Sequence, residues 1–234
     1  MDRTTLRTPF FVVNPKSYVY GADALSLARK LDELACRYDV DVLFTAQLID
    51  LPVIIGACPH LIPCAQHMDS LAPGRGMGHV LPEALAEAGV KATFLNHAEK
   101  PQSAHELARA IARAREVGLL SVVCADSVDE GRWIAHLEPD VMVCELTDLI
   151  GTGRAADEAY MRDSTDAVRG ISPGTKVLQA AGISCGADVY RAIACGADGT
   201  GGTSGIVSAD DPFATLEEMF EALDRARADF CREA

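Results

Sequence analysis

The chain has 234 residues, of which 49% are hydrophobic and 6% aromatic, so its length fits one large domain or two small ones. Its net charge is −13, with acidic residues spread along the chain, and such a surface repels nucleic acid and anionic membranes. No apolar run reaches the length of a membrane span and no signal-like segment opens the chain, so we expect a soluble, cytoplasmic protein.

Short apolar runs alternate with helical segments from one end of the chain to the other. The runs are partly β-branched and are bounded by Gly, Pro or polar residues, which is typical of buried parallel strands. We predict eight strands, at residues 10–14, 40–44, 61–65, 91–95, 119–124, 140–145, 175–180 and 197–200. The last is the weakest, because it consists mostly of Ala, Gly and Thr.

Helical signals fill the gaps between these strands. The first gap places three leucines on one helical face: Leu27, Leu31 and Leu34. Ser103 and Glu106 have the spacing of a capping box at the start of a later helix. Asp211 followed by Pro212 predicts the start of the last helix, because aspartate caps the helix and proline fits its first turn.

Eight strand–helix units in a chain of this length predict an α/β fold, a single-domain (β/α)₈ TIM barrel over residues 1–234. From the pattern alone, an open, doubly wound parallel sheet is the alternative. In a barrel, chemistry occurs at the C-terminal ends of the strands. Polar residues cluster at the predicted strand ends: Asn14 and Lys16 after the first, Asn96 and His97 after the fourth, and Glu145 at the end of the sixth.

The eight cysteines are at positions 36, 58, 64, 124, 144, 185, 195 and 231. None forms a C-x-x-C pair or lies beside a histidine pair at metal-ligand spacing. Several, such as Cys124 and Cys144, lie within apolar runs. We therefore expect free, buried thiols in a reducing compartment, and no metal site.

Three residues at the predicted strand ends carry groups suited to proton transfer. Taken singly, Lys16 could be a surface charge and His97 a hydrogen-bonded structural residue. Glu145 needs an explanation, because an unpaired carboxylate is costly to bury. All three fall at the same rim, as a proton-transfer site requires. The small-residue segment Gly151-Thr152-Gly153 that follows could cradle a phosphate or let a loop close.

These ordered motifs resemble the triosephosphate isomerase family, in particular its short archaeal form, over nearly the whole chain. Asn14-x-Lys16 resembles the substrate-holding N-x-K of the family, and Asn96-His97-Ala98-Glu99 resembles its electrophile segment. Glu145 with residues 149–153 is similar to its base and lid loop. Further matching segments are Ala65-Gln66-His67, residues 78–84, residues 181–184 and Thr203-Ser204-Gly205.

The resemblance implies an isomerase that interconverts glyceraldehyde 3-phosphate and dihydroxyacetone phosphate through an enediol(ate), without a metal or organic cofactor. Glu145 would abstract the carbon-bound proton, as a carboxylate with a raised pKa. His97 would polarise the carbonyl as an imidazole kept neutral by a helix N-terminus, a pairing for which this family is itself the standard example. Lys16 would stabilise the developing negative charge, and Glu99 would position the lysine.

The same resemblance assigns substrate binding to Asn14 and Lys16. It also assigns the phosphate to backbone amides at Ile150, Gly182, Thr203 and Ser204. Segment 145–153, with Gly151, Thr152 and Gly153, would close as a lid that excludes water. The expected partner is a small phosphorylated sugar, with no nucleic acid and no membrane, and the resemblance favours a homo-oligomer, either a dimer or a tetramer.

The chain departs from the family pattern at three places. Ala180 stands where short-form relatives usually have glycine, and residues 199–203 replace a more aliphatic strand. Met77 stands where the family often has threonine in the loop that packs into a neighbouring subunit. These departures leave two alternatives open: an isomerase of another short phosphosugar, such as an erythrulose phosphate, or a catalytically silent barrel that binds a phosphometabolite.

Overall fold

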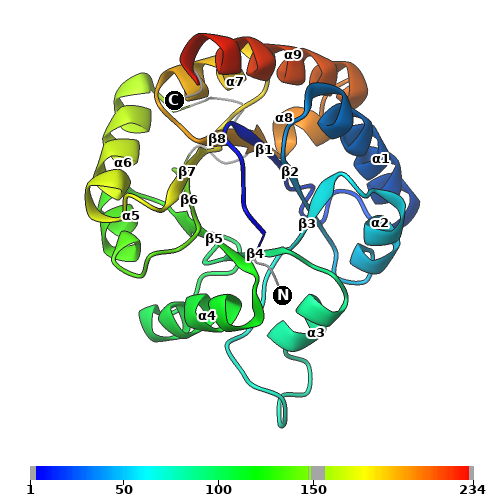
Figure 1. The fold of residues 1–234 in the computed structure, drawn as a ribbon, viewed down its shortest axis with the longest axis vertical. Coiled ribbons are helices and arrows are strands. Elements are labelled where there is room, and N and C mark those ends of the chain that lie inside the picture. Colours follow the sequence, from blue (N-terminus) through cyan, green and yellow to red (C-terminus); the bar gives the residue numbers. More distant parts are fainter. Residues whose placement is uncertain (1–3, 147, 149–155, 232–234) are drawn as a thin grey trace.

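Eight parallel strands close into one barrel, in which each strand pairs with its neighbours in chain order and β1 pairs with β8 (Figure 1). The computed structural model describes residues 4–146, 148 and 156–231. The strands are β1 (Phe10–Val13), β2 (Val42–Ala46), β3 (Leu61–Ala65), β4 (Ala92–Leu95), β5 (Leu120–Ala125), β6 (Val141–Cys144), β7 (Lys176–Gln179) and β8 (Gly199–Gly202). The predicted single-domain (β/α)₈ barrel is confirmed, and the open sheet is excluded because the β1–β8 pairing closes the ring.

Helices surround the barrel on its outside (Figure 1). They are α1 (Gly21–Tyr38), α2 (Leu51–Ala57), α3 (Pro82–Glu87), α4 (Ala104–Val117), α5 (Val128–Ala135), α6 (Glu158–Ile171), α7 (Gly186–Ala194), α8 (Ser204–Val207) and α9 (Pro212–Phe230). Within the described ranges, no helix is both long enough and apolar enough to cross a membrane.

The predicted helix starts are confirmed in part. Asp211 caps α9 by accepting from the backbone N–H groups of its first turn, and Ser103 caps α4 by accepting from the N–H of Glu106. The reciprocal half of the capping box differs, because the Glu106 carboxylate accepts from the backbone N–H of Ser70 at 3.1 Å. Glu106 thus anchors the β3–α3 connection to α4 instead of closing its own helix end.

Two apolar cores follow from the alternation of side chains along the strands. In β1, Phe10 and Val12 point into the barrel, where they join side chains from other strands such as Phe94. Phe11 and Val13 point outward and pack beneath the helices. Because both faces of most strands are buried, these strands are largely apolar in sequence, as the prediction assumed, whereas β8 (Gly199–Gly202) consists of glycine and threonine.

The glycines of β8 are explained by the close approach of β1. A Cβ atom at Gly201 would lie 1.9 Å from the carbonyl oxygen of Val12, and one at Gly199 would lie 2.6 Å from the ring of Phe10. The barrel therefore closes on backbone and an aromatic ring where an aliphatic side chain would clash.

Two predicted strands begin two residues too early, for the same reason. The N–H of Val40 bonds to the carbonyl of Ala35 in α1, and the N–H of Ala197 bonds to that of Ala192 in α7. These apolar residues lie just after the preceding helices and bond back to their last turns, so β2 and β8 start later than the apolar runs that contain them.

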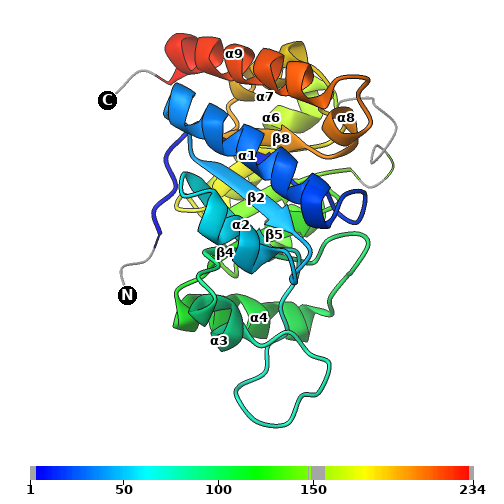
Figure 2. The same cartoon turned by 90° about the vertical axis from the view of Figure 1, so that its right-hand side faces the viewer.

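The connection between β3 and α3, residues 66–81, extends away from the barrel in both ribbon views (Figures 1 and 2). Asp69 and Val80 tie its base together: the backbone N–H of Asp69 donates to the carbonyl of Val80 at 3.0 Å, and the N–H of Val80 donates to the Asp69 carboxylate at 2.6 Å. Met77 is fully exposed within this connection.

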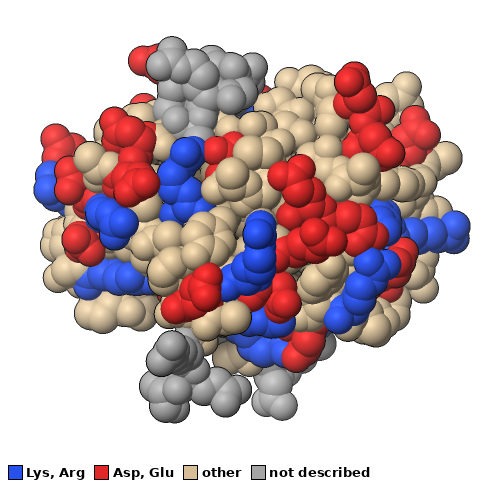
Figure 3. Space-filling view, turned by 90° about the horizontal axis from the view of Figure 1, so that it is seen from above, with Lys and Arg blue, Asp and Glu red and all other residues tan. Residues whose placement is uncertain are grey.

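Acidic and basic side chains are interspersed on the molecular face that Figure 3 shows. Ion pairs join α1 to α9, where Glu217 is paired with both Lys30 and Arg37. On this face, the described lysines and arginines form no continuous basic surface of the kind that nucleic acid requires (Figure 3).

Candidate active site

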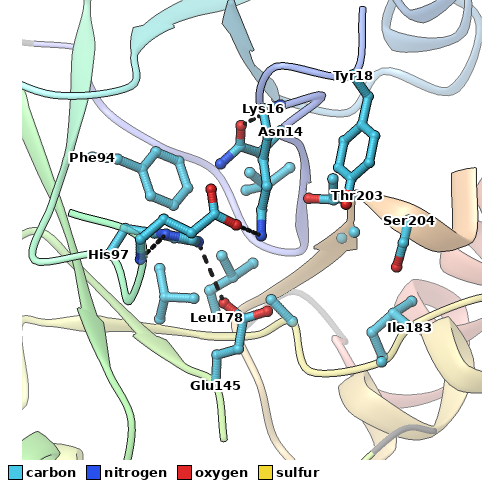
Figure 4. Close-up of a pocket in the computed structure, with 17 residues that line it drawn as sticks. Asn14, Lys16, Tyr18, Phe94, His97, Glu145, Leu178, Ile183, Thr203 and Ser204 are labelled. Carbon is cyan, nitrogen blue, oxygen red and sulfur yellow. Dashed lines mark hydrogen bonds and ion pairs between the residues drawn. The ribbon is translucent and has the colours of Figure 1, made fainter. Parts of the chain in front are cut away.

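A cavity of about 150 Å³ opens at the C-terminal ends of the strands (Figure 4). Its floor consists of inner-barrel side chains: Val12, Phe94, Val143 and Leu178. Its wall contains every predicted site residue that the structure describes: Asn14, Lys16, His97, Glu99, Glu145, Gly182, Thr203 and Ser204. The remaining predicted residues, Ile150, Gly151, Thr152 and Gly153, lie outside the described residues.

Lys16 reaches this cavity from a left-handed backbone conformation, with φ of 49°. Its N–H donates to the Oδ1 atom of Asn14 at 3.0 Å, and the Thr45 hydroxyl donates to the same oxygen at 2.6 Å. A left-handed conformation is strained for a lysine and persists only where neighbouring groups hold it. Asn14 therefore shapes the backbone that carries Lys16.

The carbonyl of Lys16 is held by two glutamine side chains. The Gln66 amide donates to it at 2.7 Å and the Gln47 amide at 3.2 Å. At the other end of the residue, the Nζ atom of Lys16 lies 2.8 Å from Glu99, and the lysine side chain is only 12% exposed. Lys16 is thus restrained at its N–H, its carbonyl and its ammonium group.

His97 follows Asn96, a second residue in the left-handed region, with φ of 54°. The Nδ1 atom of His97 accepts from the backbone N–H of Glu99 at 3.1 Å. A neutral imidazole that accepts at Nδ1 must carry its proton on Nε2, and Figure 4 shows the imidazole facing the side chain of Glu145. His97 therefore presents an N–H donor toward the space beside Glu145.

The pKa of His97 lies below its ordinary value. Burial is the main cause, the Lys16 ammonium lowers the pKa further, and Glu99 opposes both. The resemblance attributed the neutral imidazole to a helix N-terminus. In the structure the backbone donor belongs to a turn at residues 97–100, and α4 begins only at Ala104.

Glu145 lies directly after β6, and its backbone N–H donates to the carbonyl of Ala125 in β5 at 3.0 Å. Its carboxylate is 4.0 Å from the Nε2 atom of His97, and the two side chains are 17% and 13% exposed. Burial raises the pKa of Glu145, while Lys16 opposes that rise and Glu99 adds to it. A carboxylate with a raised pKa in a dry setting is a stronger base than one in water.

Thr203 and Ser204 lie at the opposite side of the cavity from His97 (Figure 4). Helix α8 begins at Ser204, and the N–H groups of Ile206 and Val207 donate to the carbonyl of Thr203 at 3.0 and 2.9 Å, which leaves the N–H groups of Ser204 and Gly205 at its start. The loops after β7 and β8 pack tightly here, since a Cβ atom at Gly205 would lie 2.4 Å from the carbonyl oxygen of Ile183. Backbone can approach a ligand closely at such a place.

The cavity also contains residues that the sequence does not predict as site residues, among them Tyr18 and Ile183. Tyr18 lines the cavity with a side chain that points down toward Thr203, and Ile183 lines the side formed by the β7 loop (Figure 4). The position of Tyr18 directly after the N-x-K motif was the available signal. Ile183 lay within the matched segment 181–184, but an isoleucine offers no chemistry that would single it out.

The departures from the family pattern fall at different places. Ala180 lines the cavity, so its methyl group occupies space beside the ligand position. Met77 does not reach the cavity of its own chain. The structure places no group of three or more His, Cys, Asp or Glu residues suited to a metal ion within residues 4–146, 148 and 156–231.

The comparisons with known proteins all point to one protein family. The family model described as triosephosphate isomerase matches residues 9–218. The triosephosphate isomerase of Sulfurisphaera tokodaii is 32% identical over 239 residues, which covers 95% of this chain and 100% of that protein. The triosephosphate isomerases of Methanopyrus kandleri and Methanosarcina acetivorans are 36% and 35% identical, and they cover 94% and 91% of this chain.

Proposed function

The chain belongs to the triosephosphate isomerase family, and we propose that it interconverts glyceraldehyde 3-phosphate and dihydroxyacetone phosphate at the cavity described above. One observation carries the proposal: a base, a neutral donor and a cation, on Glu145, His97 and Lys16, converge on one cavity from three separate strands. The reaction needs these three groups within reach of two adjacent carbons.

Glu145 would remove the proton from the substrate carbon next to the carbonyl and return it to the neighbouring carbon. The raised pKa of Glu145 supports this role, since the carboxylate then binds the transferred proton more strongly. The side chain of Glu145 is also only 17% exposed, so few of its contacts are with solvent.

His97 would donate its Nε2–H to the substrate carbonyl oxygen and help proton transfer between the two oxygens of the enediolate. The lowered pKa of His97 supports a neutral donor at physiological pH. Lys16 would supply the positive charge that stabilises the enediolate, and Glu99 would hold the lysine side chain.

The phosphate would bind where the loops after β7 and β8 meet, at Gly182, Thr203 and Ser204. The N–H groups of Ser204 and Gly205 at the start of α8 and the Lys16 ammonium in the same cavity support this assignment. Such local donors allow an acidic protein to bind an anionic substrate. The lid role of Gly151, Thr152 and Gly153, with Ile150 as a phosphate contact, stays a prediction.

A coupled assay with dihydroxyacetone phosphate tests the proposal. We expect kcat/KM of about 10⁷ M⁻¹s⁻¹ or more, as for efficient enzymes near the diffusion limit. Erythrulose phosphate serves as the comparison substrate, and faster turnover of the tetrose would reassign the substrate. Tight binding of a phosphorylated enediolate mimic without turnover of either sugar would instead identify a silent binding protein.

We further propose that the protein forms a homo-oligomer and that it acts in the cytoplasm, in glycolysis or gluconeogenesis. The projecting segment 66–81 with the exposed Met77 supports self-association, as do exposed apolar side chains on neighbouring loops, such as Tyr18, Tyr20 and Ile49. The eight cysteines are all free, which supports a reducing compartment.

A further inference from the structure

The loop that carries His97 and Glu99 is closed on itself by Asn96 and Gln102. The backbone N–H of Asn96 donates to the side-chain oxygen of Gln102 at 3.0 Å, and the N–H of Gln102 donates to the side-chain oxygen of Asn96 at 3.0 Å. Inside this ring, the N–H of Lys100 donates to the carbonyl of His97 at 2.7 Å. Segment 96–102 is therefore one rigid unit, and its orientation depends on what holds Asn96.

The side-chain amide of Asn96 joins this unit to the next strand–helix pair. Its Nδ2 atom donates to the backbone carbonyl of Cys124 at the end of β5 and to the Oε1 atom of Glu130 in α5, both at 3.1 Å. The other carboxylate oxygen of Glu130 accepts from the backbone N–H of Asp126 at 2.8 Å. Glu130 thus links the loop of His97 to the β5–α5 turn.

At position 130, only a carboxylate side chain can accept a hydrogen bond from both of its N–H partners. The Asn96 amide and the Asp126 N–H are both donors, so both oxygens must accept. A glutamine could accept from one partner but would turn its own N–H groups toward the other. The charge of Glu130 also strengthens these bonds relative to neutral pairs.

We propose that Glu130 is a positioning residue for the isomerase reaction, which orients His97 through Asn96. The inference rests on the proposed function of this site. Glu130 is not one of the described residues that line the substrate cavity. It lines a separate cavity of about 70 Å³, together with Asn96 and Glu145. Glu130 therefore acts without touching the substrate.

The loop of His97 and the residue Glu145 are both hydrogen-bonded to the C-terminal end of β5. Cys124 holds Asn96 through its carbonyl, and the next carbonyl in β5, that of Ala125, accepts from the N–H of Glu145. Without Glu130, the loop keeps one of its two bonds to this neighbouring unit. The imidazole of His97 can then shift relative to Glu145, and a displacement of about 1 Å in such a site lowers turnover by up to about 100-fold.

The test compares Glu130→Ala with Ser127→Ala. Ser127 accepts from the N–H of Glu130 and caps the same helix, but the structure gives it no bond to Asn96. Both variants should lose similar thermal stability. We expect Glu130→Ala to lower kcat for dihydroxyacetone phosphate by about 10- to 100-fold with KM changed by less than about threefold, and Ser127→Ala to stay within about twofold of the wild type.

Two further readouts separate positioning from a loss of structure. The Nε2–H signal of His97 in ¹⁵N-histidine NMR, assigned with His97→Asn, should move in Glu130→Ala and stay in place in Ser127→Ala. The second readout is the far-UV circular dichroism spectrum, which should match that of the wild type in both variants.

A kcat loss in Glu130→Ala no larger than in Ser127→Ala, or an unchanged His97 signal, overturns the inference. Failure of the proposed function would look different, because the wild-type protein would then turn over neither sugar. The NMR comparison would still decide whether Glu130 orients His97.

Discussion

Glu145 and His97 lie at the same rim, yet burial moves their pKa values in opposite directions. Burial disfavours the charged form of each group, so it raises the pKa of the carboxylic acid and lowers that of the imidazole. Lys16 lowers both pKa values. The outcome is a carboxylate of increased basicity beside an imidazole that stays neutral, which is the combination that enediolate chemistry uses.

We predict that Glu145→Asp lowers kcat by about 10²- to 10³-fold, because the carboxylate retreats by one methylene from the carbon it must reach. The fold and the affinity for a phosphorylated inhibitor should remain close to those of the wild type. The coupled assay and calorimetric titration measure these quantities. Wild-type kcat in the aspartate variant would remove Glu145 as the base.

Glu145 should also lower the stability of the folded protein at neutral pH. Because its folded pKa is raised, the native state binds the proton more tightly than the unfolded state, and ionising Glu145 destabilises the fold as the pH rises through that pKa. Glu145→Gln should therefore raise Tm at pH 7, by about 2–4 °C for each kcal/mol relieved. The gain should vanish below about pH 4, where both states bind the proton.

Thermal melts between pH 4 and pH 8 measure this difference. Glu87→Gln is the matched control, since Glu87 is exposed in α3 and its charge faces water. An increase in Tm for Glu145→Gln that is independent of pH would contradict the electrostatic explanation.

At the scale of elements, β8 differs from most strands of the barrel, because its glycines leave only backbone atoms at positions where other strands have side chains. Residues 199–202 read as a weak strand, but their glycines allow β1 and β8 to meet. The same small residues bring the start of α8 to the cavity wall, where phosphate binding is proposed. Their departure from an aliphatic pattern is thus compatible with a closed barrel.

We predict that Gly201→Ala destabilises the protein severely, by more than about 3 kcal/mol, because its methyl group would collide with the carbonyl oxygen of Val12. Gly170→Ala is the matched control in α6, where nothing lies within 4 Å of a new Cβ atom. It should stabilise the helix by about 0.5–1 kcal/mol. Urea unfolding measures both, and equal stability of the two variants would contradict the role of close packing at β8.

At the scale of the whole molecule, a net charge of −13 contrasts with an anionic substrate. The structure confines the compensating donors to one cavity, where Lys16 is 12% exposed and helix α8 begins. Local donors in a partly buried site are screened less by salt than surface charges are. Binding of the substrate therefore does not require a basic surface.

Self-association belongs to the same scale. We predict that Met77→Asp weakens the homo-oligomer by at least about tenfold in Kd, since burying a large apolar side chain contributes about 1.5–3 kcal/mol. Sedimentation velocity over a range of concentrations measures the change. Phe230→Asp is the control, because Phe230 is half exposed at the far end of α9. An unchanged oligomer in Met77→Asp would exclude this segment from the interface.

The sequence by itself determined the eight strand–helix units and the rim on which their chemistry lies, and the β1–β8 pairing in the tertiary structure closed them into a barrel. Apolar runs at regular spacing predict parallel strands, and the C-terminal ends of parallel strands meet at one edge, so Lys16, His97 and Glu145 were expected to lie together. Two strands begin later than predicted because Val40 and Ala197 bond back to the last turns of the preceding helices, and an apolar residue packs equally well after a helix or in a strand.

Only the tertiary structure decided which side chains hold the reacting groups in place. The bonds from Gln66 to Lys16 and from Asn96 to Glu130 join residues 50 and 34 positions apart. No local period or cap encodes such pairs, because they depend on how adjacent strand–helix units lie against one another in space. The sequence thus located the chemistry, while the packing of neighbouring units set its geometry.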